Sequence, residues 1–509
     1  MKKLLSVLLI LSLCLLTGCG AQEEAKGAAA LAEQEKSALQ TAFEEGKAFS
    51  LEKAELPKEG EALGGMPVSV SPDGSTWLWK ADDSLFVVRN GQEALPIKAA
   101  PDRGIGDPYG TLEEMVSALG WAMPGNEGVA WSPDSRLALM LSPQYVMQLI
   151  SKSPMGLMLL DAETGEVFLA AAYEPGIKSE HFGAAYQGAF DRSGKYLYYV
   201  DSSRANGSTP YAFKRCDLST FKTEILSADY YPCSCISMIE DKDGNWLVTG
   251  SNEESRGTDN VVRLFQANGG LKEKTTLQVE GGKWRLMQMD FCADTGWGVG
   301  YGRSQTAGMS SNLANGSIDG ATELAKVSVQ PSLVFVQVMR LIRITPEGID
   351  ADHYWYIVSD SEDGSDARAV QLSDEVTAWL GMVYEQHNLV FTDDEQKARL
   401  IAYAEELNTS LLLDVQSVCL SPDGHYALLS ASGQQERRPL DLYRFYLLDL
   451  ETMALRPVDA PEGLCGAHLV FTSPYSQKFA PCMEWNNDGT LLIYDTEAKQ
   501  VNAWRLNWQ

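Results

Sequence analysis

From residue 66 onward, apolar residues alternate with polar ones in short runs, the pattern expected of half-buried β-strands. The run from Val68 to Gly74 reads Val-Ser-Val-Ser-Pro-Asp-Gly, and an apolar run from Trp77 to Trp79 follows it. The same order of strand, turn and strand recurs in six further places, with first runs starting at Val129, Ala189, Met238, Met289, Val418 and Met483. The sequence therefore predicts seven repeated units of short strands.

The turn inside each unit has a chemical explanation. Proline presets φ for the turn, aspartate hydrogen-bonds its own backbone, and glycine takes the left-handed position without steric cost. A third strand, a second tight turn and a fourth strand follow, as in 157 to 165 and then 167 to 172. Four antiparallel strands in a repeat of about 50 to 65 residues are typical of a β-propeller blade.

On these turns the chain resembles the WD-repeat-like and TolB-like propellers, whose blades carry a Ser-Pro-Asp-Gly turn. The motif is intact at 71–74 and 421–424, while Ser135 replaces the glycine at 132–135. The resemblance covers residues 48–509 and implies a propeller. It says little about activity, because this fold hosts many unrelated roles.

The interval between Gly296 and Gly424 is about two blades long and raises the question of an eighth blade. Residues 333–344 and 354–358 predict the third and fourth strands of the fifth unit, after a long loop at 303–331. The remaining segment, 366–412, has a helical period and a capping box. Its apolar positions at helical spacing include Val376, Trp379, Leu380, Val383 and Tyr384. We predict an all-β, seven-bladed propeller with a small helical insertion at 366–412, with eight blades as the alternative.

The last unit supplies only three strands, at about 482–485, 490–495 and 501–506. An open outer edge would expose unpaired backbone groups and promote aggregation. The segment from Phe49 to Leu56 precedes the first complete unit and has no partner there. We therefore predict that it pairs antiparallel with the last strand and closes the ring.

The N-terminus has the features of an export signal. Two lysines precede an apolar run from Leu4 to Leu16, which is too short to span a bilayer comfortably. The next residues end in Thr17-Gly18-Cys19, and Leu16 to Cys19 resembles the lipobox of bacterial lipoproteins. The resemblance implies removal of residues 1–18 as a signal peptide and lipidation of Cys19 at the outer face of a bacterial cell membrane, where two acyl chains anchor durably. Residues 19–47 are rich in Ala and Glu and are predicted to form a partly helical membrane tether.

Charge narrows the choice of partners. The chain has 41 basic and 69 acidic residues and a formal net charge of −28. Nucleic acid and anionic lipid surfaces are unsuitable partners for such a protein. Seven cysteines follow Cys19, and most are predicted to be packed, inert thiols.

The long segments between predicted strands all fall on one face of a propeller, which we call the long-loop face. Rigid scaffolds display function on such loops, so we expect a partner to bind there. The segments are 98–127, 142–155, 173–187, 202–210, 251–260, 303–331, 366–412, 431–441 and 459–480.

No established catalytic motif is found, and no cofactor or metal site is predicted. Residues 484–495 echo a calcium loop, but the repeat turn demands the same residues. Aromatic, arginine and histidine side chains in the long loops are the candidate ligand-binding residues, as recognition surfaces favour them. They are Tyr109, Tyr145, His181, Tyr230, Tyr231, Arg437, Arg438 and His468.

The sequence thus predicts a surface-anchored lipoprotein. Its propeller is expected to be a binding scaffold for a protein or a cell-envelope glycan, contacting the membrane through its lipid. The alternative is an extracellular propeller hydrolase or lyase acting on a polymer.

Overall fold

The computed structural model divides the chain into two compact units, Met1–Lys47 and Ala48–Gln509. In the first unit the described residues start at Ser37 and form helix α2 (Ala38–Glu44), whose N-cap Ser37 accepts a hydrogen bond from the Gln40 amide. The structure describes residues 37–509 except for 83, 109, 111, 120–128, 141–155, 173–187, 202–210, 231, 253–259, 267–269, 278–284, 293, 311–331, 362, 372–394, 396–410, 434–442, 474–475 and 496–497.

Four sheets of the second unit are separate from one another. Three of them contain four consecutive strands that pair as antiparallel neighbours in the order of the sequence. The other, which is the second along the chain, has the same arrangement with one further outer strand, β6 (Lys98–Gly104), parallel to β10 (Glu166–Ala172). The first sheet contains β2 (Met66–Val70), β3 (Thr76–Ala81), β4 (Ser84–Arg89) and β5 (Leu95–Pro96). The second contains β6 (Lys98–Gly104), β7 (Val129–Trp131), β8 (Leu137–Met140), β9 (Gly156–Asp161) and β10 (Glu166–Ala172). The third contains β11 (Gly188–Phe190), β12 (Tyr196–Asp201), β13 (Tyr211–Asp217) and β14 (Lys222–Tyr230). The fourth contains β15 (Pro232–Glu240), β16 (Trp246–Asn252), β17 (Asn260–Phe265) and β18 (Leu271–Leu277).

The other strands form one thirteen-stranded sheet, in which twelve strands follow one path, and one hairpin. The path begins with β19 (Arg285–Phe291), β20 (Gly298–Ser310), β21 (Ser332–Thr345) and β22 (Gly348–Ser359), with β23 (Arg368–Gln371) paired to β22. It continues through β24 (Leu411–Leu420), β25 (Tyr426–Gly433), β26 (Tyr443–Asp449) and β27 (Leu455–Asp459). It ends with β1 (Phe49–Lys53), β32 (Gln500–Trp508), β31 (Thr490–Asp495) and β30 (Met483–Trp485). The hairpin consists of β28 (Ala467–Ser473) and β29 (Ser476–Pro481).

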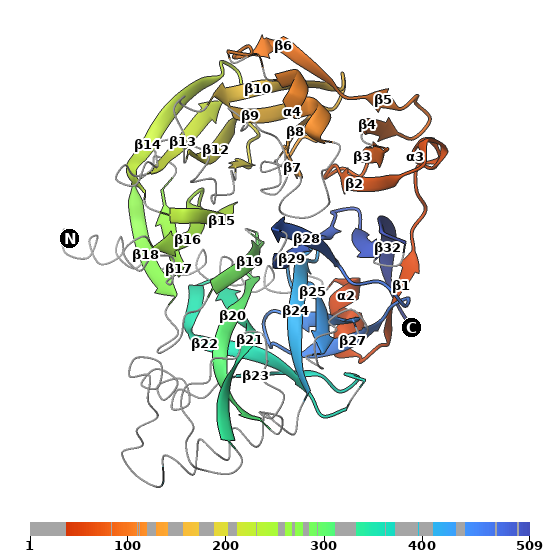
Figure 1. The fold of residues 1–509 in the computed structure, drawn as a ribbon, viewed down its shortest axis with the longest axis vertical. Coiled ribbons are helices and arrows are strands. Elements are labelled where there is room, and N and C mark those ends of the chain that lie inside the picture. The colour runs from red at the N-terminus through yellow and green to blue at the C-terminus, as the bar shows by residue number, and fades with distance from the viewer. Residues whose placement is uncertain are drawn as a thin grey trace, which may run out of the picture. The chain divides into compact units, whose positions relative to one another are not determined.

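The sheets follow one another around a central axis, which makes the second unit a β-propeller (Figure 1). Apolar faces of neighbouring sheets pack together: Val68 and Leu78 of the first sheet share a buried cluster with Met158 of the second. Such face-to-face burial explains why the apolar residues alternate in the sequence. Each of the seven predicted first hairpins is confirmed as an antiparallel pair, from β2–β3 to β30–β31.

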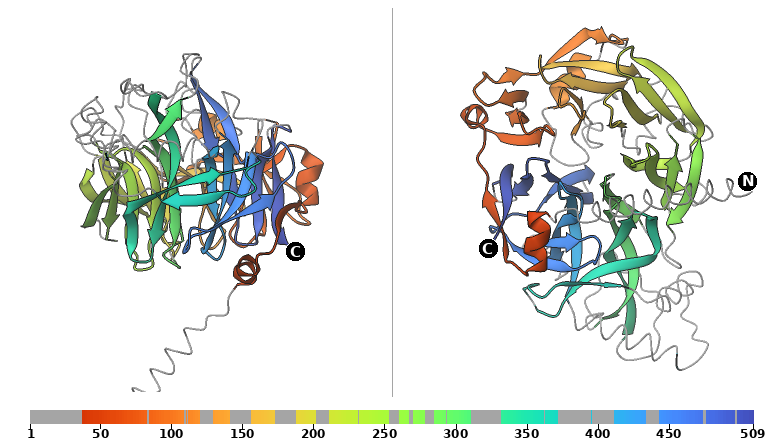
Figure 2. Two further views of the ribbon diagram at one scale, coloured as in Figure 1. Left: turned by 90° about the horizontal axis from the view of Figure 1, so that it is seen from below. Right: turned by 180° about the vertical axis from the view of Figure 1, so that it is seen from behind.

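The turns of these hairpins lie on one face of the propeller, which we call the turn face. In the first hairpin Gly74 N–H donates to the Ser71 carbonyl at 2.8 Å. The second turn of a unit lies beside the first, because the Ala162 amide donates to the Arg136 carbonyl at 2.9 Å. The strands run between this face and the opposite one, and the C-terminus lies at the edge of the propeller (Figure 2).

The predicted pairing of the two ends is confirmed. Strand β1 is antiparallel to β32, with Phe49 opposite Trp508 and Lys53 opposite Trp504. It also pairs in parallel with β27, where Phe49 is opposite Val458. The strand therefore satisfies backbone groups on both sides and links the outer strands of two consecutive units.

Several segments expected to be loops contain regular structure. Segment 98–127 contains β6 and the helix α4 (Leu112–Ala118), and segment 459–480 contains β28 and β29. The loop predicted at 303–331 is shorter, because β20 extends to Ser310. A short helix, α3 (Lys58–Leu63), follows β1. In the part of the chain that the structure describes, no helix has the length and apolar composition to cross a bilayer.

The predicted bounds of the helical insertion, 366–412, are wrong at both ends. Arg368–Gln371 form strand β23, and β24 begins at Leu411. These residues pair with β22 and lie outside the positions at helical spacing, Val376 to Tyr384, so sheet pairing decides their structure. Glu395 has helical conformation, and the rest of 372–410 lies outside the described residues.

Candidate functional site: a cavity in the central channel

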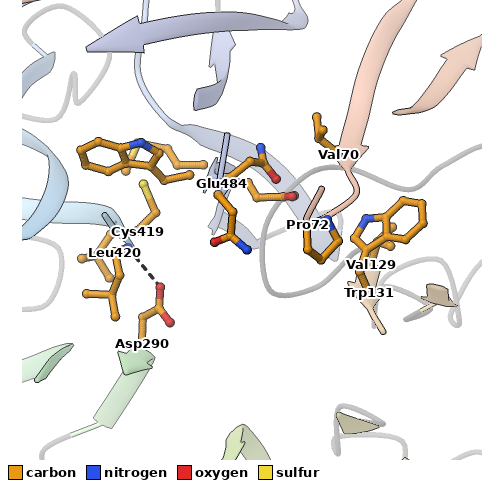
Figure 3. A pocket seen from close by; sticks show the side chains of 13 residues that line it. Val70, Pro72, Val129, Trp131, Asp290, Cys419, Leu420 and Glu484 are labelled. Carbon is orange, nitrogen blue, oxygen red and sulfur yellow. Dashed lines mark hydrogen bonds between the residues drawn. The ribbon is translucent and has the colours of Figure 1, made fainter. Parts of the chain in front are cut away.

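Five first strands, β2, β7, β19, β24 and β30, surround a cavity of about 270 Å³ (Figure 3). The cavity lies towards the turn face, because turn residues such as Pro72 and Asn487 contribute to its wall. Its lining consists of Val70, Pro72, Val129, Trp131, Asp290, Val418, Cys419, Leu420, Met483, Glu484, Trp485, Asn486 and Asn487.

A chain of hydrogen bonds fixes one side of this cavity. The indole Nε1–H of Trp131 donates to Ser69 Oγ at 3.0 Å, and the Ser69 hydroxyl donates to Glu484 Oε1 at 2.9 Å. Ser69 is fully buried, so its hydroxyl depends on these partners. The three side chains come from three first strands and hold Glu484 and Trp131 in place at the cavity wall.

The second carboxylate at the cavity is Asp290 of β19. Its Oδ1 accepts from the Phe291 amide at 2.9 Å and its Oδ2 from the Leu420 amide at 3.2 Å; Figure 3 shows the latter bond. Burial raises the pKa of the Asp290 carboxyl because it removes water from the charged form, and the two backbone hydrogen bonds partly offset that increase. Asp290 is therefore positioned by main-chain donors from two strands.

Cys419 of β24 also lines the cavity and is buried. Burial, with the negative charges of Asp290 and Glu484, raises the pKa of the Cys419 thiol well above its ordinary value. A thiol that stays protonated at neutral pH is a poor nucleophile and a poor metal ligand. Cys419 therefore acts as a small apolar wall residue.

The calcium-loop residues serve the last repeat turn. Asp488 accepts hydrogen bonds from the amide and hydroxyl of Thr490 at 2.9 and 2.8 Å, and Asn486 Nδ2 donates to the Thr490 carbonyl at 3.1 Å. Within the described parts of the chain, no group of three or more His, Cys, Asp or Glu side chains is arranged to hold a metal ion.

The structure does not bring the sequence-predicted site residues together. Tyr230 lies in β14 and His468 in β28. Tyr109, Tyr145, His181, Tyr231, Arg437 and Arg438 lie outside the described residues, as does Cys19. Binding at the long-loop face therefore stays a prediction.

Sequence reasoning missed the channel residues, although the repeat contains a signal. Ser69, Cys419 and Glu484 each lie five residues before the turn glycine of their unit, and Asp290 has the equivalent place before a turn one residue longer. The other units have Ala130, Ala189 and Ile239 at this position. Polar residues thus replace apolar ones at this position in some units, and this difference would have identified the residues that line the channel.

No known family model matches the sequence, and no curated protein matches it. Similar solved structures include the Cps50 (Swd1) β-propeller domain of Myceliophteria thermophila, with 11% identity, coverage of 87% of this chain and 96% of that one, and a TM-score of 0.39. An oligogalacturonate lyase of Vibrio parahaemolyticus has 10% identity, coverage of 91% and 96%, and a TM-score of 0.45. An oligogalacturonate lyase in complex with manganese has 9% identity, coverage of 87% and 88%, and a TM-score of 0.43. These likenesses are too distant to bear on activity, and the propeller assignment rests on the sheets described above.

Proposed function

We propose that this protein is an exported, lipid-anchored β-propeller that acts as a binding scaffold for a protein or a cell-envelope glycan. The observation that carries the binding role is the way in which the channel carboxylates are held. Asp290 accepts two main-chain hydrogen bonds, and Glu484 accepts one from Ser69. Acids fixed in this way form a rigid recognition surface, and rigid polar groups in a cavity give binding specificity.

We also propose that the propeller has seven blades. In support, the thirteen-stranded sheet contains three groups in the order of the complete sheets: β19–β22, β24–β27, and β30–β32 with β1. Each group starts with one of the predicted hairpins. Three such groups added to the four separate sheets give the seven units of the sequence, and the eight-bladed alternative would require a further sheet within 372–410.

The lipid anchor at Cys19 has support from the signal pattern of residues 1–19. The end of β32 lies at the turn face, because Arg505 Nη1 donates to the carbonyl of the turn residue Asp488 at 3.2 Å. Ala48 exchanges backbone hydrogen bonds with Gln509 and so lies at the same face. A tether leading to Cys19 would leave the propeller from that face.

The binding role is tested by photo-crosslinking in cells. A crosslinking amino acid at Asn487, in the wall of the channel cavity, should capture a discrete partner, because the fixed carboxylates line the same cavity. The same amino acid at Tyr145 or Arg437 tests the predicted long-loop face. The matched control replaces Glu163, an exposed residue in a turn-face hairpin. Capture from Asn487 no greater than from Glu163 would contradict a binding role for the channel, and no capture from Tyr145 and Arg437 would contradict one for the long-loop face.

The alternative, a polymer hydrolase or lyase, has one observation in its favour. Asp290 and Glu484 line the same cavity, and the raised pKa of Asp290 is the property of a general acid. An enzyme of this kind would release new chain ends from an extracellular polysaccharide, and Asp290→Asn and Glu484→Gln would each abolish the release. Cleavage that survives both substitutions would place any activity elsewhere.

A further inference from the structure

The charge of the channel cavity is of one sign. Asp290 and Glu484 are the ionisable acids in its wall, and none of the thirteen described residues that line it is Lys, Arg or His. In a cavity with protein walls such a field is screened less than at an open surface. An anionic or neutral sugar group gains little from it, whereas a cation is attracted by the acidic wall and meets no positively charged side chain there.

The cavity also has aromatic walls. Trp131 and Trp485 line it from two different first strands, and the hydrogen bond from Trp131 Nε1 to Ser69 fixes the orientation of one indole. The face of an indole ring attracts a cation, and tryptophan does so most strongly among the aromatic residues. Carboxylates and indoles together are suited to an organic cation with apolar substituents, because each satisfies a different part of it.

We propose that the channel cavity binds an organic ammonium group. This inference rests on the proposed binding function and names the chemistry of its ligand. The cavity volume of about 270 Å³ is close to the lower end of the range for small-molecule sites, which fits a head group or a side chain more closely than a glycan chain. The amides of Asn486 and Asn487 and the thioether of Met483 complete a wall without positive charge.

The ammonium group has two possible sources that share this chemistry. One source is a lipid head group, because the proposed anchor would keep the propeller close to a membrane. A free amine, or an amine on a protein, would present the same charge. The test therefore has separate arms for the two sources.

The experiment uses the full chain in maltoside detergent, whose head group has no charge to compete. Tetramethylammonium and tert-butanol each give a single sharp methyl resonance, so ligand-observed NMR compares a cation with a neutral probe of similar size. We expect saturable tetramethylammonium binding at least tenfold tighter than that of tert-butanol. Equal affinity for the two probes would overturn the proposal.

Matched variants locate the binding. Glu484→Gln keeps an oxygen acceptor for Ser69 and removes the charge, so tetramethylammonium affinity should fall about tenfold, equivalent to about 1.4 kcal/mol. Asp290→Asn is a second variant at an independent strand and should weaken binding in the same direction. Glu163→Gln, an exposed acid outside the cavity, should leave the affinity unchanged. Loss of affinity in Glu163→Gln alone, or in none of the three variants, would contradict the cavity as the site.

The second arm adds vesicles of phosphatidylethanolamine to the tetramethylammonium complex. Displacement that is absent in Glu484→Gln identifies a lipid head group as the source, whereas retained probe assigns the site to a free or protein-borne amine. If the ammonium probe does not bind while crosslinking from Tyr145 or Arg437 still captures a partner, the ammonium inference is wrong and the binding scaffold stands. If the probe binds and no partner is captured, the long-loop scaffold fails instead.

Discussion

Closure of the propeller by β1 should contribute a large part of the free energy of unfolding. The side chains of Phe49 and Leu51 are 3% and 6% exposed, and both residues pair with β32, opposite Trp508 and Leu506. Truncation of a buried Phe to Ala costs about 3–5 kcal/mol, and that of a buried Leu about 2–5 kcal/mol. The double variant should therefore lose about 5 kcal/mol or more of a total that for most proteins is about 5–15 kcal/mol.

The assay is urea unfolding followed by circular dichroism, with light scattering to detect association through the freed strand edge. Lys53→Ala is the control, because Lys53 belongs to the same strand with an exposed side chain and should change stability by less than about 0.5 kcal/mol. The single variants Phe49→Ala and Leu51→Ala keep the test usable if the double variant does not fold. If both single variants unfold at the same urea concentration as Lys53→Ala, the closure reasoning is refuted.

Three further predictions concern single residues. The free energy of unfolding should rise as the pH falls from neutral through the raised pKa of Asp290, because the folded state binds the proton more tightly than the unfolded state. The gain is about 1.4 kcal/mol for each unit by which the pKa is raised, and it is complete below the ordinary aspartate pKa. Urea unfolding across pH should show this gain in the wild-type chain and not in Asp290→Asn. Ser135 has a left-handed φ of 61°, and its hydroxyl accepts a hydrogen bond from the Asp73 amide at 3.2 Å. Ser135→Ala should therefore lower the free energy of unfolding by about 1 kcal/mol, whereas Ser135→Gly recovers a similar amount because glycine adopts this φ without strain. Equal losses for the two variants in denaturant unfolding would disprove this. Gly424→Ala should lower the melting temperature more than Gly91→Ala. Both glycines have positive φ, but a Cβ at Gly424 would meet Cys292 and one at Gly91 would have no atom within contact distance. Equal shifts in melting temperature would contradict the close approach of the turns that contain Gly424 and Cys292.

The repeat could be predicted from sequence because its determinants are local. A turn such as Ser71 to Gly74 is specified by its own four residues, and the flanking alternation specifies two strands. The closing strand could also be predicted, because Phe49 and Leu51 alternate with polar residues and the last unit is short by one strand. Strand β6 was missed because Lys98–Gly104 has a polar, proline-containing sequence, and its pairing with β10 is set by tertiary contacts.

The channel cavity could not be predicted as a site because its residues come from strands more than 400 positions apart. Ser69 and Glu484 contact each other only after the ring has closed. No single one of these residues is unusual within its own repeat unit. Only a comparison of the units shows that Ser69, Asp290 and Glu484 are polar at a position where other units have an apolar residue. The long-loop residues were chosen by composition, which indicates where recognition is common but not which side chains converge.

The proposed lipid anchor at Cys19 holds the propeller outside the cell, and metabolic labelling tests it. Cells that express the full chain are fed an alkyne fatty acid, and the purified protein is examined for the label. We expect label on the wild-type chain and on Cys14→Ala, whose substitution lies in the apolar signal core, and none on Cys19→Ala. A wild-type chain without label, or label that persists in Cys19→Ala, would contradict the claim.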